Sequence, residues 1–391
     1  MHQLAFLTGT TSGRPFLPIS QPTLPDVEAY TAGVREIFAS HQITNERRVR
    51  DLEAKAAGYL GCREVVALAN ATSGLVLLAR LLGMKGDVCL PSFTFPATLH
   101  ALLWNNLKPR LIDCDPETFN ISPESLEAGL ASGARGAVPV YIFGNSPDWE
   151  RLQPILARHG ASCYSDAAHG LGTRWDGVMA GNFGDAEVFS LAPTKVTVAG
   201  EGGLVATNNP ELAGALRIAR NYGNPGDYDC VVAGLNARMT ELHAWLATLS
   251  LDGTEAAIDR RHQLVARYRA GLEGVPGIGF QKMDRRCRTT YNYVAVLLEP
   301  GAFGLSNRQV KKILEAEGIQ CRIYFAPPLH RQSRFTHLFE GQGPFPGTDA
   351  VLERVLCLPL YTHMSDDSVD YVVEVLRACH SQAERLASVL D

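Results

Sequence analysis

The sequence predicts an α/β fold with a large, mostly parallel sheet flanked by helices, followed by a smaller C-terminal α+β domain. Short apolar runs alternate with helical stretches between residues 64 and 207, which is the pattern of consecutive βα units. Most of these runs are apolar throughout, as in parallel strands that are buried on both faces. After about residue 245 the alternation ends and longer, charged helices begin.

The elements follow from these patterns in chain order. Seven apolar runs are the expected strands of the large sheet: 64–69, 88–91, 110–114, 137–142, 162–166, 186–190 and 203–207. Helices are expected between them at 73–82, 96–104, 123–130 and 148–158. In the last third we expect a helix at 253–274, a strand at 291–298, a helix at 307–317, a strand at 320–325 and a closing helix at 368–390. We therefore predict two domains, 1–245 with an N-terminal arm and the large sheet, and 246–391.

Composition limits the classes of function. The 391 residues are 46% hydrophobic and 20% charged, which predicts a soluble globular protein with a large core. A net charge of −5 offers no general attraction to nucleic acid or to a membrane surface. No stretch is long enough to span a membrane, and the first fifteen residues lack a signal-peptide core. Nine scattered cysteines without a Cys-x-x-Cys pair argue against zinc and disulfides, so we expect no metal and a cytoplasmic location.

One acidic residue lies where α/β proteins bind ligands. Asp166 ends the run 162–166 and begins the small-residue turn that contains His169. The carboxyl ends of parallel strands form the ligand-binding edge of such sheets. A carboxylate there could bind a metal, act as a general base or hold a protonated heterocyclic nitrogen. A helix-capping role remains an equal alternative.

A lysine follows the next predicted strand. Lys195 comes after the run 186–190 and precedes the glycine-rich segment 200–203. Among apolar and hydroxyl neighbours a lysine loses its proton more easily, which Schiff-base chemistry requires. A surface lysine in a loop is the plain alternative. The glycines match neither a P-loop nor a dinucleotide-binding fingerprint.

Two further segments complete a possible cofactor site. Residues 70–74, Asn-Ala-Thr-Ser-Gly, lie between an apolar strand and an apolar helix, where backbone N–H groups and hydroxyls can bind phosphate or simply cap the helix. Phe95 follows another strand and could stack on a flat ring or lie in the core. A phosphate cup, an aromatic ring, a carboxylate and a lysine occur here in the order that pyridoxal 5'-phosphate (PLP) requires.

At these residues the sequence resembles the DegT/DnrJ/EryC1/StrS family of PLP-dependent sugar aminotransferases, which have the aspartate-aminotransferase-like fold of type I PLP transferases. The resemblance runs from about residue 16 to about residue 380. It is carried by the segments 70–73, 91–95, 113–120, 166–169, 189–203, 234–239 and 324–330. It implies that Lys195 holds PLP as a Schiff base, that Asp166 pairs with the pyridine nitrogen and that Phe95 stacks on the ring.

The resemblance also implies the remaining cofactor contacts. Thr72 and Ser190 would bind the phosphate beside Ala71, and Asn236 would reach the phosphate of a neighbouring subunit in a homodimer with shared active sites. His169 stands where many relatives carry Gln and would hydrogen-bond near the phenolic oxygen of the cofactor. Ala71 replaces a usual glycine, which raises a question about the backbone of the phosphate cup. The family's usual histidine is also absent from residues 141–143.

The implied activity is transfer of an amino group from an amino acid, L-glutamate, to a nucleotide-linked 4-keto-6-deoxyhexose in amino- or deoxysugar biosynthesis. The candidate substrate ligands, by resemblance and position, are Arg238, Arg322, Tyr324 and His330. One alternative is a PLP-dependent sugar dehydratase on the same scaffold, although such relatives replace the lysine with histidine. Another is a non-catalytic sensor or scaffold with the PLP fold. A generic amino-acid aminotransferase or desulfurase should not reproduce Asn236 or the segment 329–330.

Overall fold

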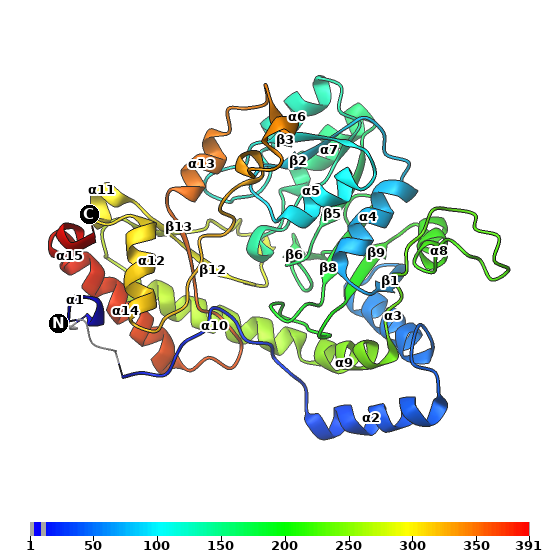
Figure 1. The fold of residues 1–391 in the computed structure, drawn as a ribbon, viewed down its shortest axis with the longest axis horizontal. Helices are drawn as coiled ribbons and strands as arrows, with labels where there is room; N and C mark the ends of the chain where they lie inside the picture. The colour runs from blue at the N-terminus through cyan, green and yellow to red at the C-terminus, as the bar shows by residue number, and fades with distance from the viewer. Residues whose placement is uncertain (1–3, 9–12, 391) are drawn as a thin grey trace.

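The computed structural model describes residues 4–8 and 13–390, and Figure 1 shows a large sheet on one side and a smaller sheet with its helices on the other. The large sheet has the strand order β1-β9-β8-β5-β4-β2-β3. Its strands are β1 (Glu64–Leu68), β2 (Asp87–Pro91), β3 (Lys108–Ile112), β4 (Gly136–Ala137), β5 (Ser162–Asp166), β8 (Ala186–Ser190) and β9 (Gly203–Thr207). β9 runs antiparallel to both neighbours, whereas the pairs among β3, β2, β4, β5 and β8 are parallel. The predicted large, mostly parallel sheet is confirmed.

One strand of this sheet is much shorter than predicted. The run 137–142 supplies only its first residue to β4, and Val140 forms an isolated bridge with Asp166. Pro139 has no N–H to donate to a strand ladder. After it the chain turns into the 3-10 helix η1 (Ile142–Gly144). The prediction of a strand through residue 142 was wrong, because it took the run as a strand despite Pro139.

Helices cover both faces of the large sheet. α4, α5 and α8 form one hydrophobic core with it, and α3, α6, α7 and α9 form a second core on the opposite face. Their bounds are α3 (Arg47–Leu60), α4 (Ala71–Leu81), α5 (Pro96–Leu103), α6 (Pro123–Ala131), α7 (Trp149–His159), α8 (Pro210–Ala219) and α9 (Glu241–Asp252). Five of them are capped by a side-chain oxygen that accepts a backbone N–H of the first turn; the capping residues are Asn70, Ser122, Asp148, Asn209 and Thr240.

α3 begins in a different way, because Glu46 provides no side-chain cap. The buried carboxylate of Glu241, at the start of α9, accepts hydrogen bonds from the backbone N–H groups of Glu46 at 2.8 Å and Arg48 at 2.7 Å. A negative charge at this position also interacts favourably with the helix dipole of α3. The two helices are therefore joined by a cap that comes from a distant part of the chain.

The smaller part contains the antiparallel sheet β10-β12-β13, with β10 (Ile278–Phe280), β12 (Val294–Leu298) and β13 (Val355–Leu358). Its helices are α10 (Thr254–Leu272), α11 (Pro300–Phe303), α12 (Asn307–Ala316), α13 (Pro346–Leu352), α14 (Asp366–Ser381) and α15 (Ala383–Leu390). α10, α12 and α14 share one hydrophobic core with this sheet. A short ribbon, β6 (Arg174–Trp175), β7 (Val178–Met179) and β11 (Cys287–Arg288), links the two parts of the chain.

Two predictions in this part were wrong. Residues 320–325 form no strand; Arg322 makes one isolated bridge to Cys357, and the chain then turns at Tyr324 and Phe325 towards two prolines. Proline disfavours continued strand pairing. The closing helix predicted at 368–390 is two helices, α14 and α15, because the helical path is interrupted at Gln382.

The two parts are also joined near the N-terminus. α1 (Ala5–Thr8) and Leu17 belong to the smaller part, since Leu4 and Leu17 lie in its core. α2 (Val27–Ser40) then crosses to α9, where Gly33 lies so close to Trp245 that a side chain there would clash with the indole ring. The division at residue 245 falls within α9, so the domain boundary at 245 stays a prediction.

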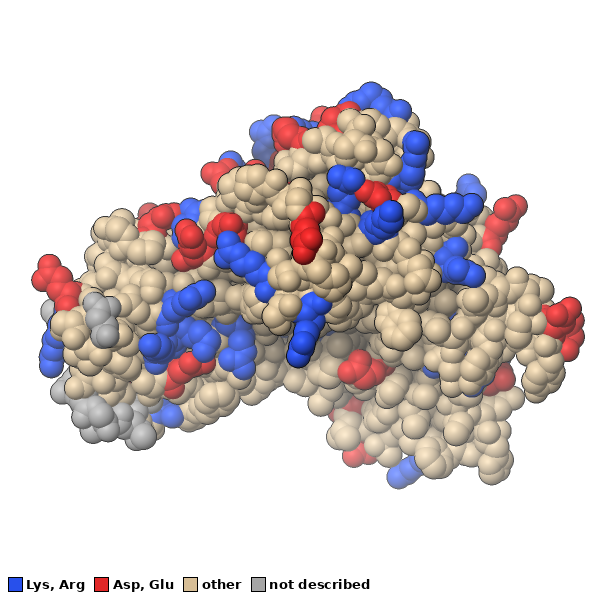
Figure 2. All heavy atoms as spheres, turned by 45° about the horizontal axis from the view of Figure 1, so that its top comes forward, with Lys and Arg blue, Asp and Glu red and all other residues tan. Residues whose placement is uncertain are grey.

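Charged side chains of both signs intermingle on the face shown in Figure 2, and neither sign covers it. On this face the mixture agrees with the small net charge and forms no extended basic surface. Among the described residues, every helix is too short or too polar to cross a bilayer.

Candidate active site

A cavity of about 360 Å³ lies at the carboxyl ends of β5 and β8. Its walls come from the ends of the central strands, the start of α4 and two segments of the smaller part. The sequence-predicted residues in its lining are Ala71, Thr72, Phe95, Asp166, His169, Ser190, Lys195 and Tyr324. Residues as far apart in the chain as Asn70 and Phe325 thus meet in one site.

Asp166 is the last residue of β5, and it is buried. Its Oδ2 accepts a hydrogen bond from Thr98 Oγ1 at 2.7 Å, and its Oδ1 accepts one from the N–H of Ala168 at 3.2 Å. Burial raises the pKa of this carboxyl, while both hydrogen bonds and the charge of Lys195 oppose the rise. A carboxylate can accept about four hydrogen bonds. Asp166 therefore retains acceptor capacity towards the cavity.

Lys195 lies in the turn that follows β8, where its N–H donates to Ala192 O at 3.0 Å. Burial lowers the pKa of its ammonium from 10.5 to about 8, and the negative charges of Asp166 and Glu201 oppose this change. The amine is thus uncharged far more often near neutral pH than a solvated lysine would be. It has the properties of a nucleophile and of a proton carrier.

The start of α4 forms the phosphate cup that the sequence suggests. Asn70 Oδ1 accepts from the N–H of Ser73 at 2.8 Å, which fixes the first turn. The N–H groups of Ala71 and Thr72 lie in that turn, where a helix has no partner of its own for them. Ala71 is a helical residue without a positive φ, so alanine fits here as well as glycine. The question raised by this departure from the family pattern is therefore resolved.

His169 is held between two aromatic rings. Phe143 stacks on it at a centroid distance of 6.3 Å, and Tyr293 meets it edge-on at 5.5 Å. Burial holds the pKa of His169 well below its usual value, and the charge of Lys195 acts in the same direction. The neutral imidazole has one donor and one acceptor nitrogen. Phe143 has a left-handed backbone (φ 60°, ψ 17°), which costs about 1–3 kcal/mol for a bulky residue.

Aromatic side chains form another part of the cavity wall. Phe95, 59% exposed, meets Phe325 at 6.2 Å, and Tyr324 lies 5.0 Å from Tyr293. Burial raises the pKa of both tyrosines, so their hydroxyls stay protonated. Sequence reasoning missed Tyr293, Phe325 and Thr98. No local motif marks the first two, whereas Thr98 lies one turn into a helix that follows a strand end and could have been found.

Four predicted residues do not line the cavity of this chain. Asn236 is exposed, and Arg238 bonds to Asn221 Oδ1 at 2.5 Å. Arg322 forms a 3.8 Å ion pair with Glu315. His330 shares a 2.6 Å hydrogen bond with Ser92 Oγ. None of these four residues is among those that line the cavity.

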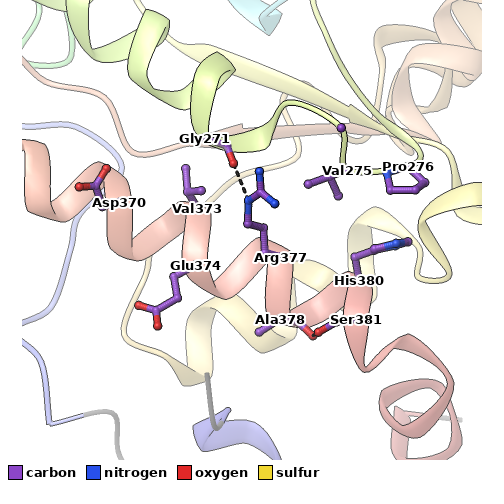
Figure 3. Close-up of a pocket in the computed structure, with 11 residues that line it drawn as sticks. Gly271, Val275, Pro276, Asp370, Val373, Glu374, Arg377, Ala378, His380 and Ser381 are labelled. Atoms are coloured by element: carbon purple, nitrogen blue, oxygen red, sulfur yellow. Dashed lines mark hydrogen bonds between the residues drawn. The ribbon is translucent and has the colours of Figure 1, made fainter. Parts of the chain in front are cut away.

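A larger hollow of about 890 Å³ lies between the end of α10 and α14 (Figure 3). Arg377 reaches across it, and its Nε donates to Gly271 O at 2.6 Å while Nη2 donates to Glu273 O at 3.1 Å. This arginine thereby satisfies carbonyl groups at the end of α10. None of the predicted site residues lines the hollow, so the smaller cavity is the candidate active site.

The residues of the smaller cavity fit PLP. Asp166 has a buried carboxylate with spare acceptor capacity, Lys195 has a desolvated amine, and the first turn of α4 has N–H groups free for a phosphate. In the described part of the chain, no group of three metal-ligating side chains comes together. The donor set therefore matches an organic phosphate cofactor with a basic ring nitrogen and an aldehyde.

The comparisons with known proteins agree with this chemistry. A model of the DegT/DnrJ/EryC1/StrS aminotransferase family matches residues 26–377. The chain belongs to this family. DegT/DnrJ/EryC1/StrS enzymes depend on PLP, and this chain is a PLP-dependent sugar aminotransferase of fold type I. This favours the aminotransferase over a dehydratase or a sensor on the same scaffold.

Individual members of the family are similar over almost the full chain. The structure of DesI, determined in the presence of its TDP-sugar product, has a TM-score of 0.94, 35% sequence identity and 99% coverage of each chain. The Escherichia coli dTDP-4-amino-4,6-dideoxy-D-glucose transaminase is 27% identical over 92% of this chain and 98% of its own. A UDP-N-acetyl-3-dehydro-alpha-D-glucosamine 3-aminotransferase of Acidithiobacillus ferrooxidans is 29% identical over 88% and 92%. Membership thus leaves the sugar open.

Proposed function

We propose that this sugar aminotransferase transfers the amino group of L-glutamate to a nucleotide-linked 4-keto-6-deoxyhexose. The observation that carries the proposal is the pair of Asp166 and Lys195, both desolvated and both facing one cavity. The sugar class is supported by the TDP-sugar product of DesI and by the name of the Escherichia coli relative. The aromatic wall of Tyr324 and Phe325 also suits a sugar edge that carries a methyl group.

Each residue has a task that follows from its position. The carboxylate of Asp166 holds the proton on the pyridine nitrogen, because an adjacent negative charge favours the charged ring. When bound, PLP supplies the electron sink for transamination. Lys195 Nζ would hold the cofactor through its aldehyde, and the freed amine would be the group that moves a proton at the donor α-carbon. Thr72, Ser190 and the N–H of Ala71 bind the phosphate.

The remaining contacts place the ring and the substrate. Phe95 stacks on the cofactor, and neutral His169 hydrogen-bonds near its phenolic oxygen. Of the four proposed substrate ligands, Tyr324 is the one that lines the cavity of this chain. Among the described residues, Lys195 is the one lysine or arginine in that lining, and it would be bound to the cofactor. A diphosphate and a donor carboxylate therefore need cations from another source.

A second copy of the chain is the source that we propose. Asn236 and Arg238 end a segment that exposes apolar side chains, Tyr222, Tyr228, Val231 and Leu235. Exposed apolar groups that gather on one segment mark an interaction surface. In the proposed homodimer Asn236 reaches the partner's cofactor phosphate, and Arg238 reaches the partner's substrate. The nine free cysteines suit the reducing cytoplasm, where we propose that the enzyme acts.

Absorption spectroscopy of the purified protein tests the function. With PLP, L-glutamate should bleach the visible band as the cofactor takes up the amino group, and a nucleotide-linked 4-keto-6-deoxyhexose should restore it. Restoration by a 3-keto sugar alone would show that the sugar class is wrong. Hybrid dimers of Lys195→Ala and Arg238→Ala subunits should regain activity, since one of their two sites is intact. Hybrids as inactive as the parents would contradict the shared site.

A further inference from the structure

Glu187 is a buried carboxyl for which the proposed reaction has no use. It lies in the middle of β8, the strand that leads to Lys195, and it is fully buried. Its Oε2 accepts hydrogen bonds from the backbone N–H groups of Gly181 and of Phe183, the latter at 3.1 Å. The other oxygen, Oε1, accepts no hydrogen bond from the described residues. An acidic group that is buried in this way costs free energy that a leucine would not.

The hydroxyl of Tyr141 faces this carboxyl. Burial, and after it the Glu187 carboxyl, raises the pKa of Tyr141, whereas the Tyr141 hydroxyl opposes the rise that burial causes in the pKa of Glu187. Tyr141 Oη also accepts a hydrogen bond from Trp149 Nε1 at 2.9 Å. Because the indole is a donor only, the proton of the Tyr141 hydroxyl remains available for an acceptor. The unbonded Oε1 of Glu187 is well suited to be that acceptor.

The ring of Tyr141 connects Glu187 to the active site. It lines the cavity, and its backbone N–H donates to Asp166 O at 3.0 Å. It also supports the turn that carries His169, since a Cβ atom at Gly170 would lie 3.0 Å from Cδ1 of the ring. Such a close approach leaves the turn little freedom as long as the ring stays in place.

We propose that Glu187 is a positioning residue of the cofactor site: it holds the Tyr141 hydroxyl, and the Tyr141 ring in turn supports the segment that presents Asp166 and His169. The inference rests on the cofactor roles proposed above for those two residues. Glu187 itself is not among the described residues that line the cavity. Its removal should therefore loosen the site without removing any ligand of PLP.

The surroundings of Glu187 make its ionisation a useful probe. Burial raises the pKa of Glu187 to about 7, although the hydrogen bonds from the Tyr141 hydroxyl and from the N–H groups of Gly181 and Phe183 oppose this rise. The titratable groups that face it are Tyr141, Cys163 on β5 and Cys62 after α3. The largest contributions to its pKa are burial, the Tyr141 hydroxyl and backbone N–H groups, and none of these comes from a lysine, arginine or histidine side chain. The carboxyl therefore changes charge close to neutral pH.

The test compares Tyr141→Phe, Glu187→Leu, Glu187→Gln and the double variant Tyr141→Phe/Glu187→Leu as holoenzymes. The readouts are the dissociation constant of PLP and the pH dependence of its visible band without substrate. We expect Tyr141→Phe and Glu187→Leu each to weaken PLP binding about tenfold, the value of one hydrogen bond, and the double variant to be no weaker. Glu187→Gln should keep the affinity, because its amide group retains a hydrogen bond with the Tyr141 hydroxyl, and should lose any spectral step near pH 7.

Glu241→Gln is the matched control, since Glu241 is also a buried carboxylate that accepts backbone N–H groups but caps α3. It should lower the melting temperature and leave the spectrum unchanged. The same result for Tyr141→Phe, or an additive loss in the double variant, would overturn the positioning role. Tyr141→Phe removes one atom, so the test survives if Glu187→Leu fails to fold. Borohydride trapping of PLP on Lys195 in the wild type separates this outcome from a failure of the proposed function.

Discussion

Two regions of the molecule bury charged side chains, which form an ion pair in one region and no ion pair in the other. Where α3, α8 and β1 meet, the buried pair Glu53 and Arg220 is in direct contact, and Glu53 Oε1 also accepts from the N–H of Ala67 at 3.0 Å. In the cavity, Asp166 and Lys195 influence each other's pKa without forming a salt bridge. The charges of the first region are paired, and those of the second are not.

The difference shows what each region contributes. In the paired region the two charges compensate each other, so the contact fixes the arrangement of helices and strand and offers no reactive group. In the cavity, burial displaces the pKa of Asp166 upwards and that of Lys195 downwards. Both groups gain partners when PLP binds, so binding should stabilise the fold. A cavity that leaves charges unpaired in the free protein is thus prepared for a ligand that carries the complementary groups.

The largest effect should come from the cavity. Lys195→Ala removes the covalent attachment point and the proton carrier together, so we expect kcat to fall by about 10⁴-fold or more. The same variant should not lower the free energy of unfolding of the PLP-free protein, because it removes a desolvated charge. Rate assays and denaturant unfolding on one preparation check both statements. Appreciable remaining transamination would defeat the assignment of Lys195.

A smaller effect, on stability alone, should come from the paired region. Arg220→Ala leaves Glu53 buried without its closest partner, and we expect the free energy of unfolding to fall by about 3 kcal/mol. Arg217→Ala is the control, since this half-exposed arginine lies 3.5 Å from Glu53 and should cost about 1 kcal/mol or less. Denaturant unfolding measures both. A folded Arg220→Ala protein with an altered PLP spectrum would break the division between the two regions.

The sequence predicts one half of the cavity much better than the other. Thr72, Asp166, Ser190 and Lys195 follow the ends of successive strands, and the parallel sheet brings those ends to one edge. Tyr293 belongs to the smaller part of the chain and has no motif around it. Its place beside His169 depends on how the two parts pack, which local patterns do not encode.

The errors in the fold have the same origin. The run 137–142 has the apolar character of a strand, but Pro139 has no N–H to donate to a neighbouring strand, and Phe143 adopts a left-handed backbone. The run 320–325 turns at Tyr324 towards the cavity, where its side chain meets Tyr293. In both places a proline ends the strand pairing, and the residues beside it line the active site.

The smallest expected effect, a change in pH dependence, compares the regions most directly. The neutral amine of Lys195 reacts with the PLP aldehyde, so the rate of attachment to the PLP-free enzyme should fall tenfold per pH unit below about 8 and level off above it.

The unfolded chain, with an ordinary lysine, binds more protons between about pH 8 and 10.5, so the free energy of unfolding should rise with pH there. Lys195→Met should flatten that rise, and Asp166→Asn should move the rate plateau to lower pH by removing an opposing charge. If the rate of PLP attachment instead rises with pH up to the usual lysine pKa without a plateau, Lys195 is solvated, and the cavity does not hold an unpaired buried charge.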